Sequence, residues 1–188
     1  TRIAAVLQPE AFVEIGEAIG NVEAYSTVDI KPQIEGQIDE VGFREGQDVK
    51  TGDLLFRIDA RPFEAALRKA EANRARNEAE LENAKAEADR VTKLHEKGLS
   101  SSDEFDLART RLDAVRASVL ADAAAVEDAR LDLAYCSIHS PVDGRTGSLL
   151  VNAGNVVKAR EVTLVTIKQV QPIYVSFSVS EKHLAKIR

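Results

Sequence analysis

The chain has 188 residues and carries 25 Lys and Arg against 31 Asp and Glu, a formal net charge of -6. Its composition, 44% hydrophobic and 30% charged, is typical of a globular rather than a disordered chain. The acidic balance argues against a nucleic-acid-binding protein, and no apolar run is long enough to span a bilayer. A single cysteine excludes an internal disulfide and a cysteine metal cluster, and the absence of Met leads us to expect a processed or trimmed chain.

Strands are predicted in the first and last thirds of the chain, with a helical insert between them. Glycine and proline mark turns and strand ends, whereas alanine favours helices. Between Pro62 and Pro141 there is one glycine, Gly98, and there are eighteen alanines. Strand-like alternation of apolar and polar residues also occurs close to both ends of the sequence, over residues 12–20 and 173–179.

The insert, residues 61–136, is predicted to form two helices that pack as a coiled coil. Apolar or small residues recur at steps of three, four or seven, at Phe63, Leu67, Ala70, Leu81, Ala84, Ala88 and Val91 in the first arm and at Phe105, Ala108, Leu112, Val115, Val119, Val126, Ala129 and Leu133 in the second. Arg74, Asn77 and Asp122 interrupt this pattern at expected seam positions, where the two helices meet. Each arm of roughly 30–35 residues would be about 50 Å long.

A short linker joins the two arms. Gly98 suits the position just after a helix end. Ser101, followed three residues later by Glu104, fits a capping box that opens the second arm. Because so few residues separate the helices, the chain must fold back on itself, and an antiparallel hairpin is predicted.

The segments on either side of the insert match each other at a fixed offset of 108 residues. The matched pairs are Ile30 and Ile138, Ile34 and Val142, Gly36 and Gly144, Gly46 and Gly154, Val49 and Val157, and Lys50 and Lys158. Alternation predicts a strand face with Leu54, Phe56 and Ile58 in the first copy, and a matching one with Val162 and Leu164 in the second. A copy of about 32 residues cannot bury its apolar face alone, so the two copies are predicted to form one β-sandwich with a pseudo-twofold axis.

Two such half-motifs, split by a helical hairpin, resemble the biotinyl/lipoyl-like domain of periplasmic adaptor (membrane fusion) proteins of Gram-negative efflux pumps. The segments that carry the resemblance are 31–36, 44–49, 54–59, 133–135, 140–145 and 171–175. The last of these resembles the start of the family's β-barrel domain and is most like adaptors of resistance-nodulation-division (RND) pumps. The resemblance implies an α+β fold, with a lipoyl-like β-sandwich from residues 28–60 and 137–169, a hairpin over 61–136, and a partial β-barrel domain over 1–27 and 170–188.

The predicted hairpin tip also resembles the family. Members carry an Arg, a Leu four residues later and a Ser seven residues beyond that, which are here Arg90, Leu94 and Ser101. The resemblance implies that this trio docks a TolC-type outer-membrane channel. Arg90 and Leu94 would share one helical face, one turn apart. The helix pattern alone also allows a plainer interpretation, in which the three residues are a solvated charge, a seam residue and an N-cap.

No motif in the sequence indicates catalysis, a metal site or a bound cofactor. The three histidines, His95, His139 and His183, lie far apart without ligand spacing, so each is predicted to be a surface or structural residue. Cys136 is predicted to be a small buried residue rather than a reactive thiol. Carrier lipoyl and biotinyl domains are modified on a lysine in the turn that joins their halves. Here the hairpin replaces that turn and Lys50 and Lys158 lie elsewhere in the repeat.

The resemblance therefore implies a non-enzymatic adaptor in the periplasm, anchored to the inner membrane by a segment outside this sequence. It would link an inner-membrane transporter, of the RND type, to a TolC-type channel, and would assemble as a homo-oligomer, a trimer or a hexamer. An adaptor of an ABC-type or type I secretion exporter is the alternative within the family. A lipoyl or biotinyl carrier domain and a generic coiled-coil dimeriser are alternatives outside it, although the dimeriser leaves the repeat unexplained.

Overall fold

The computed structural model describes residues 20–177 of the chain. The chain divides into two compact units, residues 1–57 with 138–188 and residues 58–137. Most of the predicted β-barrel segments, residues 1–19 and 178–188, lie outside the described residues. Neither helix of the described region is long and apolar enough to cross a membrane.

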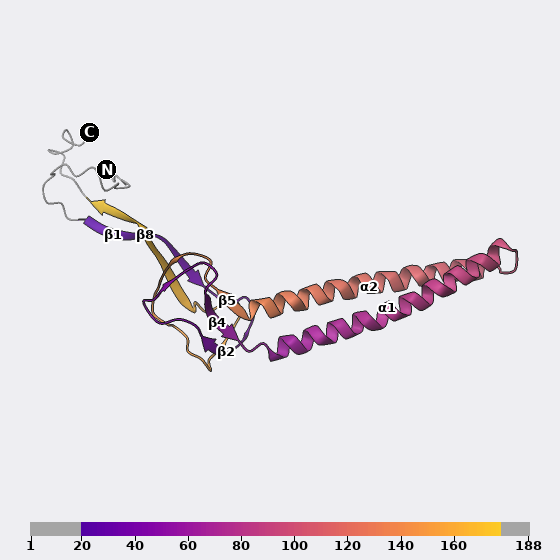
Figure 1. The fold of residues 1–188 in the computed structure, drawn as a ribbon, viewed down its shortest axis with the longest axis horizontal. Helices are drawn as coiled ribbons and strands as arrows, with labels where there is room; N and C mark the ends of the chain where they lie inside the picture. The colour runs from indigo at the N-terminus through magenta and orange to yellow at the C-terminus, as the bar shows by residue number, and fades with distance from the viewer. Residues whose placement is uncertain (1–19, 178–188) are drawn as a thin grey trace, which may run out of the picture. The chain divides into compact units, whose positions relative to one another are not determined.

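The strands form two four-stranded sheets, and each sheet takes strands from both sides of the helical insert (Figure 1). The first sheet has the order β1-β8-β6-β3, formed by β1 (Gly20–Ile30), β8 (Val165–Phe177), β6 (Gly144–Thr146) and β3 (Asp48–Val49). The second has the order β5-β4-β2-β7, formed by β5 (Ser137–His139), β4 (Leu54–Ile58), β2 (Gly36–Val41) and β7 (Val156–Val157). Neither flank of the insert can therefore complete a sheet without the other.

The predicted repeat is present as a pseudo-twofold relation between strand pairs. Gly36 of β2 pairs with Val157 of β7, and Gly144 of β6 pairs with Val49 of β3. These two pairs exchange into each other under the offset of 108 residues. A Cβ atom on Gly144 would lie 2.7 Å from the Lys168 carbonyl oxygen, so the close approach of the strands requires glycine there. The α+β sandwich built from two related halves is confirmed.

The turns obey the same symmetry. Gly52 has a φ of 93° and donates its N–H to the Ser140 carbonyl at 2.8 Å. At the equivalent position of the second copy, Arg160 has a φ of 62° and donates to the Pro32 carbonyl at 2.8 Å. Residues other than glycine rarely adopt this left-handed backbone conformation. Arg160 adopts it because the repeat places the same turn at this position.

The core of the sandwich contains residues from both copies, and Phe56 and Leu164, which are equivalent under the offset, are both fully buried. The rings of Phe43 and Phe56 meet edge to face at 5.3 Å. The strand face predicted for Val162 is wrong, because Val162 precedes β8 and is 39% exposed. The chain passes through the turn that contains Arg160 and rejoins the sheet only at Leu164.

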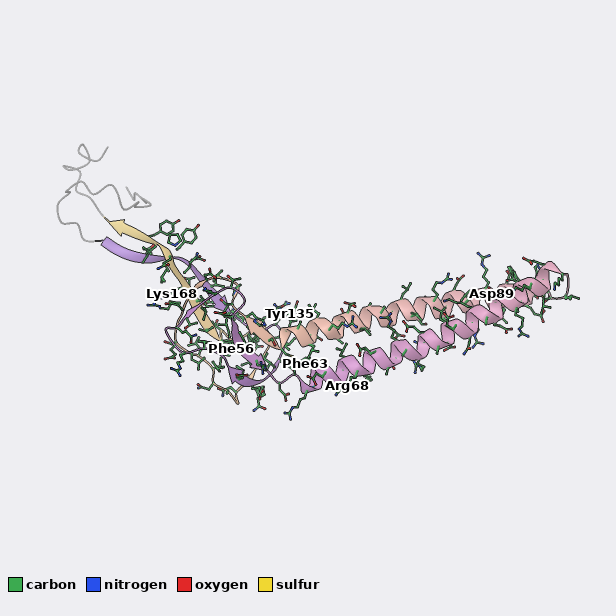
Figure 2. The ribbon with its side chains drawn as sticks, in the orientation of Figure 1. Phe56, Phe63, Arg68, Asp89, Tyr135 and Lys168 are labelled. Carbon is green, nitrogen blue, oxygen red and sulfur yellow. The ribbon has the colours of Figure 1, made fainter. Side chains whose placement is uncertain are left out.

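The insert forms the predicted antiparallel hairpin of α1 (Arg61–Glu96) and α2 (Ser102–Tyr135), which lie side by side (Figure 1). All the predicted apolar seam residues are buried or half-buried. Charged side chains such as Arg68 and Asp89 extend from the exposed surface of α1 (Figure 2). The coiled-coil pattern in the sequence therefore predicted the correct helix faces.

The polar interruptions of the seam have partners. The Nδ2 atom of Asn77 on α1 donates to Oδ2 of Asp122 on α2 at 2.6 Å, so two of the interruptions hydrogen-bond to each other across the hairpin. Arg74 pairs with Glu78 of its own helix at 2.8 Å. A buried polar pair specifies register, since any slip of one helix along the other separates the two partners.

Removing one member of this polar pair should cost more stability than removing both. Asp122→Ala leaves the half-buried Asn77 amide without its partner and should lower the free energy of unfolding by about 1–3 kcal/mol. The double variant Asn77→Leu/Asp122→Leu should recover this loss, because two apolar residues match the rest of the seam. Thermal unfolding followed by circular dichroism would measure both, and a double variant less stable than Asp122→Ala would contradict the prediction.

Candidate functional site at the hairpin tip

A Schellman motif ends α1. Leu99 donates its N–H to the Leu94 carbonyl at 2.8 Å, and Gly98 donates to the His95 carbonyl at 2.8 Å. Gly98 has a φ of 68°, the left-handed conformation that this motif requires, which confirms the position predicted for it. The motif places Leu99 at the apex of the hairpin with 70% of its surface exposed.

The predicted capping box begins α2. The hydroxyl of Ser101 accepts the Glu104 N–H at 3.2 Å, and the Glu104 carboxylate accepts the Ser101 N–H at 3.0 Å. Asp103 and Glu104 also place negative charge at the helix N-terminus, where it is favourable. Ser101 is exposed, yet its hydroxyl and its backbone N–H are each held by a local hydrogen bond to Glu104.

Arg90 is exposed near the end of α1 and is oriented by its neighbour Glu87. Its Nη2 and Nε atoms lie 2.5 Å and 3.2 Å from Oε2 of Glu87. This hydrogen bond, with the charge of Glu87, raises the pKa of Arg90, so the guanidinium is charged at any physiological pH. A guanidinium has five N–H donors, and two of them engage Glu87, so the others remain available to a partner.

The structure brings the three predicted docking residues to one end of the hairpin. Arg90 and Leu94 lie one turn apart in the last two turns of α1, and Ser101 is the N-cap of α2. Leu94 is half-buried, while Arg90 and Ser101 are exposed. The plainer interpretation is correct for Ser101 as an N-cap, but an N-cap hydroxyl can still meet a partner. The docking role of the trio stays a prediction.

The contact between His95 and Phe105 at the tip was not predicted from the sequence. The rings of His95 and Phe105 stack at 5.0 Å with an interplanar angle of 19°, and Nδ1 of His95 lies 3.3 Å from the Ser100 carbonyl oxygen. His95 was expected to be a surface or structural histidine, which agrees with these contacts. Its one sequence signal is an aromatic residue ten positions later, across a predicted turn.

The serine before the N-cap is in a different environment. In the described part of the chain, Ser100 Oγ is the buried side-chain oxygen or nitrogen that makes no hydrogen bond. A buried hydroxyl without a partner loses its hydrogen bonds to water and gains none in return. Ser100 and Ser101 are adjacent, but of their two hydroxyl groups only that of Ser101 makes a hydrogen bond within the described residues.

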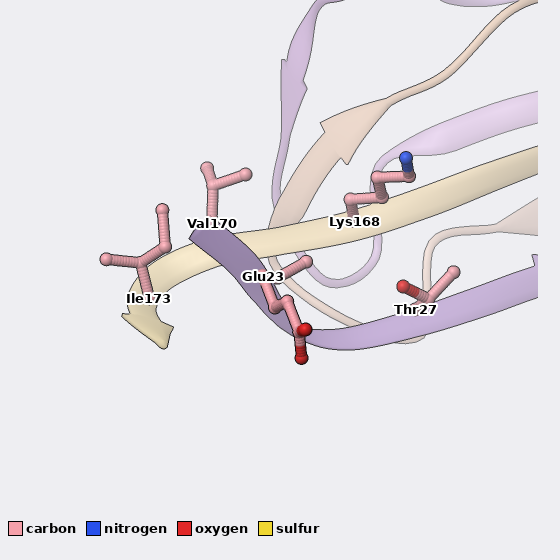
Figure 3. Close-up of a pocket in the computed structure, with 6 residues that line it drawn as sticks. Glu23, Thr27, Lys168, Val170 and Ile173 are labelled. Atoms are coloured by element: carbon pink, nitrogen blue, oxygen red, sulfur yellow. The ribbon is translucent and has the colours of Figure 1, made fainter. Parts of the chain in front are cut away.

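Outside the hairpin tip, the described residues include a buried cysteine and an open hollow beside the β1–β8 ladder. Cys136 is buried as predicted, and burial, with the charges of Asp132, Asp59 and Glu64, raises the pKa of its thiol. Across residues 20–177, no cluster of His, Cys, Asp or Glu could hold a metal ion. An open hollow between β1 and β8 is lined by Glu23, Ala24, Thr27, Lys168, Val170 and Ile173 (Figure 3). This lining combines one carboxylate, one amine and one hydroxyl with three aliphatic side chains.

The fold agrees with what comparison with known proteins shows. Residues 26–169 match the profile of a family described as RND MFP, barrel-sandwich hybrid domain. The chain belongs to this family of membrane fusion proteins. It is 35% identical over 185 residues to multidrug resistance protein MdtA of Pantoea ananatis, an alignment that covers 98% of this chain and 45% of that protein. It is 37% identical over 171 residues to MdtA of Proteus mirabilis, covering 90% and 42%. The chain thus spans less than half the length of these relatives.

Solved structures show the same fold. A MacA–MexA chimeric protein that contains the Pseudomonas aeruginosa MexA α-hairpin domain is 30% identical, with a TM-score of 0.57 over 91% of this chain and 58% of that one. The membrane fusion protein Spr0693 of Streptococcus pneumoniae has a TM-score of 0.67 over 90% and 73% at 18% identity, which supports the fold alone.

Substitution of the two adjacent serines should change the stability of the hairpin in opposite directions. Ser101→Ala removes the cap and should lower the free energy of unfolding by about 1 kcal/mol. Ser100→Ala removes the unpartnered hydroxyl and should raise it by about 1 kcal/mol. Each variant serves as the control for the other, because both delete one oxygen atom. Urea unfolding followed by helical circular dichroism would measure them, and a loss of stability in Ser100→Ala would contradict the assignment of its hydroxyl.

Proposed function

We propose that this chain is the central part of a non-enzymatic periplasmic adaptor in a tripartite pump that exports drugs or other toxic compounds. It links an inner-membrane transporter of the RND type to a TolC-type outer-membrane channel, and a segment outside this sequence anchors it to the inner membrane. The observation that carries the proposal is a long hairpin, inserted between the halves of a barrel-sandwich hybrid domain, with Arg90, Leu94 and Ser101 at its tip. The relatives named multidrug resistance proteins support the same function.

The proposed division of the chain follows the limits drawn from the sequence. The lipoyl-like domain comprises residues 28–60 and 137–169, the hairpin comprises 61–136, and residues 1–27 and 170–188 belong to a β-barrel domain. The ladder between β1 and β8 supports the outer limits, because its register shifts between Ala24 and Ser26. Pro172, which cannot donate to a ladder, lies in the corresponding stretch of β8.

The chemistry of the tip suits a helical partner. Arg90 can donate to carboxylates or helix C-terminal carbonyls of a channel, Leu94 offers an apolar contact beside it, and the Ser101 hydroxyl can donate while it accepts the Glu104 N–H. Because local hydrogen bonds already hold Arg90 and Ser101, little conformational entropy is lost when a partner binds. The mechanism we propose is therefore coupling by contact between proteins, without bond chemistry.

Homo-oligomer formation, as a trimer or a hexamer, is supported by the outer surface of α2. Opposite the seam, α2 presents a run of exposed uncharged residues, consisting of Ala114, Ala117, Ser118, Leu120, Ala121, Ala124 and Ala125. Leu120 is 68% exposed. An isolated surface helix normally carries polar residues on this side. We propose that the outer surface of α2 packs against α1 of the next copy.

The unpaired charges of the two helices complement each other. Considering only ion pairs among residues 20–177, the exposed basic residues of α1 that lack one are Lys69, Arg76 and Lys93, followed by the C-cap Lys97. The exposed acidic residues of α1 that lack one are Asp89 and Glu96. By the same criterion, the exposed acidic residues of α2 that lack an ion pair are Asp103, Glu104, Asp106, Asp128 and Asp132, and the exposed basic one is Arg109. A head-to-tail contact between α2 and a neighbouring α1 therefore brings opposite net charges together and can close into a ring.

Arg90→Ala should weaken binding of the full-length adaptor to a purified TolC-type channel by about tenfold or more, since a hydrogen bond to a charged group is worth about 1.5–3 kcal/mol. The matched control is Arg68→Ala, which removes an exposed α1 arginine that is also paired within one turn, to Glu64. Surface plasmon resonance with immobilised channel would measure both. Full channel binding by Arg90→Ala would refute the assignment of the tip.

Ala121→Glu should reduce self-association of the adaptor because it buries a charge in the proposed contact between neighbouring hairpins. The control, Ala153→Glu, places the same charge on an exposed turn of the sandwich and should leave self-association unchanged. Sedimentation velocity would give the oligomer distribution, and circular dichroism would show that the hairpin is still helical. An unaltered oligomer in Ala121→Glu would contradict this use of α2.

Co-purification with the transporter distinguishes the proposal from its alternative within the family. An RND transporter recovered with the tagged full-length adaptor is the expected result. Recovery of an ABC-type exporter or a type I secretion component would instead favour the alternative.

Intact-mass measurement of the same preparation should show no lipoyl or biotinyl group, because the connection between β4 and β5 is the hairpin itself.

A further inference from the structure

The imidazole of His95 connects three segments of the hairpin tip. It projects from the last turn of α1, stacks on the Phe105 ring in the first turn of α2 at 5.0 Å, and lies 3.3 Å through Nδ1 from the Ser100 carbonyl oxygen in the loop. His95 directly follows Leu94 in the sequence, and Ser100 directly precedes Ser101. The ring therefore lies between the two ends of the proposed docking trio.

Within the described residues, no main-chain hydrogen bond joins the end of α1, at Leu94, directly to the start of α2, at Ser101. The Schellman motif ties Gly98 and Leu99 back to α1, and the capping box ties Ser101 forward to α2. Among the described residues, His95 is the one whose side chain hydrogen-bonds to the loop of residues 97–100. The hydrogen bond of His95 thus adds a connection between the Leu94 and Ser101 ends of the loop that the Schellman motif and the capping box do not supply.

We propose that His95 is a positioning residue for channel docking, because its hydrogen bond to the Ser100 carbonyl fixes Ser101 relative to Leu94. This inference rests on the proposed function of the tip. A carbonyl oxygen can only accept, so Nδ1 must carry the proton and act as the donor. The stack on Phe105 sets the plane of the ring and so aims Nδ1 at the loop.

Two substitutions separate the donor from the ring. His95→Phe keeps an aromatic ring to stack on Phe105 but removes the donor, whereas His95→Asn keeps an N–H donor near the position of Nδ1 and removes the ring. The matched control is His139→Phe, because Nδ1 of His139 makes the same kind of contact with the Gly52 carbonyl, at 2.9 Å, in the sandwich.

The measurement uses the full-length adaptor and a purified TolC-type channel from the same organism, with hairpin stability followed by circular dichroism. His95→Phe should lower the affinity for the channel by about tenfold while the hairpin melts as in the wild type. His95→Asn should recover most of the affinity even though it stacks poorly, and His139→Phe should bind as the wild type does. If His95 acted through stability alone, His95→Phe, which keeps the stacked ring, would bind the channel more tightly than His95→Asn.

Other results overturn one proposal or the other. Wild-type affinity in His95→Phe, alongside reduced affinity in Arg90→Ala, overturns the role of His95 and leaves the tip assignment intact. If His95→Asn and His95→Phe lose the same amount of affinity for the channel, the hydrogen bond of His95 does not position the tip. If the wild-type adaptor does not bind the channel, the proposed function itself fails, and the role of His95 fails with it.

Discussion

The two halves of the β-sandwich depend on each other because each sheet is completed by a strand pair that joins residues on opposite sides of the helical insert. Gly36 meets Val157, and the symmetry-equivalent Val49 meets Gly144. The chain must therefore leave the sandwich after β4 and return to it at β5, the neighbouring strand. At the base of the hairpin, Ile58 donates its N–H to the Cys136 carbonyl at 2.8 Å. An insert whose ends are held this close can be long only if it doubles back, and two antiparallel helices do so with the main chain fully hydrogen-bonded.

The seam of a long hairpin has a particular weakness, because its apolar contacts, here formed by Ala, Val, Leu and Phe, recur at every turn. Similar side chains repeated along such a seam do not distinguish one register from the next. The hydrogen bond between Asn77 and Asp122 supplies that distinction in the middle of the hairpin, far from both ends. Register matters for function, since a slip by one turn would carry Leu94 past Ser101 and separate the groups proposed to meet one channel. The polar interruptions of the seam are therefore part of how the tip is positioned.

Much of this architecture could be predicted from the sequence because it depends on local rules. The positions of Gly98 and Ser101 follow from helix-end chemistry. The repeat is visible in part because Gly36 and Gly144 recur at the offset of 108 residues, and the close approach of the strands requires glycine at Gly144. The prediction for Val162 failed although the offset holds at the turn, where Arg160 reproduces the backbone conformation of Gly52. β4 begins directly after its turn, at Leu54, whereas β8 begins only at Val165, so Val162 lies before the strand. The environments of His95 and Ser100 could not have been predicted, since stacking on Phe105 and enclosure of a hydroxyl depend on the packing of side chains across the loop.

The tip combines groups that stabilise it with groups that are available to a partner, and the two sets overlap. Ser101 caps α2 and is exposed; Glu87 orients Arg90 and leaves part of its guanidinium unengaged. Because of this overlap, substitution of the proposed docking residues Arg90 and Ser101 also costs the hairpin stability. Leu99 is 70% exposed at the apex and has no side-chain group that can hydrogen-bond, so its substitution should cost the hairpin less. We therefore expect discrimination between related channels to arise at Leu99, and the shared features of docking at Arg90 and Ser101. Exchanging Leu99 for a residue of different size should shift preference among TolC-type channels while leaving helix content unchanged, which binding assays against two channels would measure.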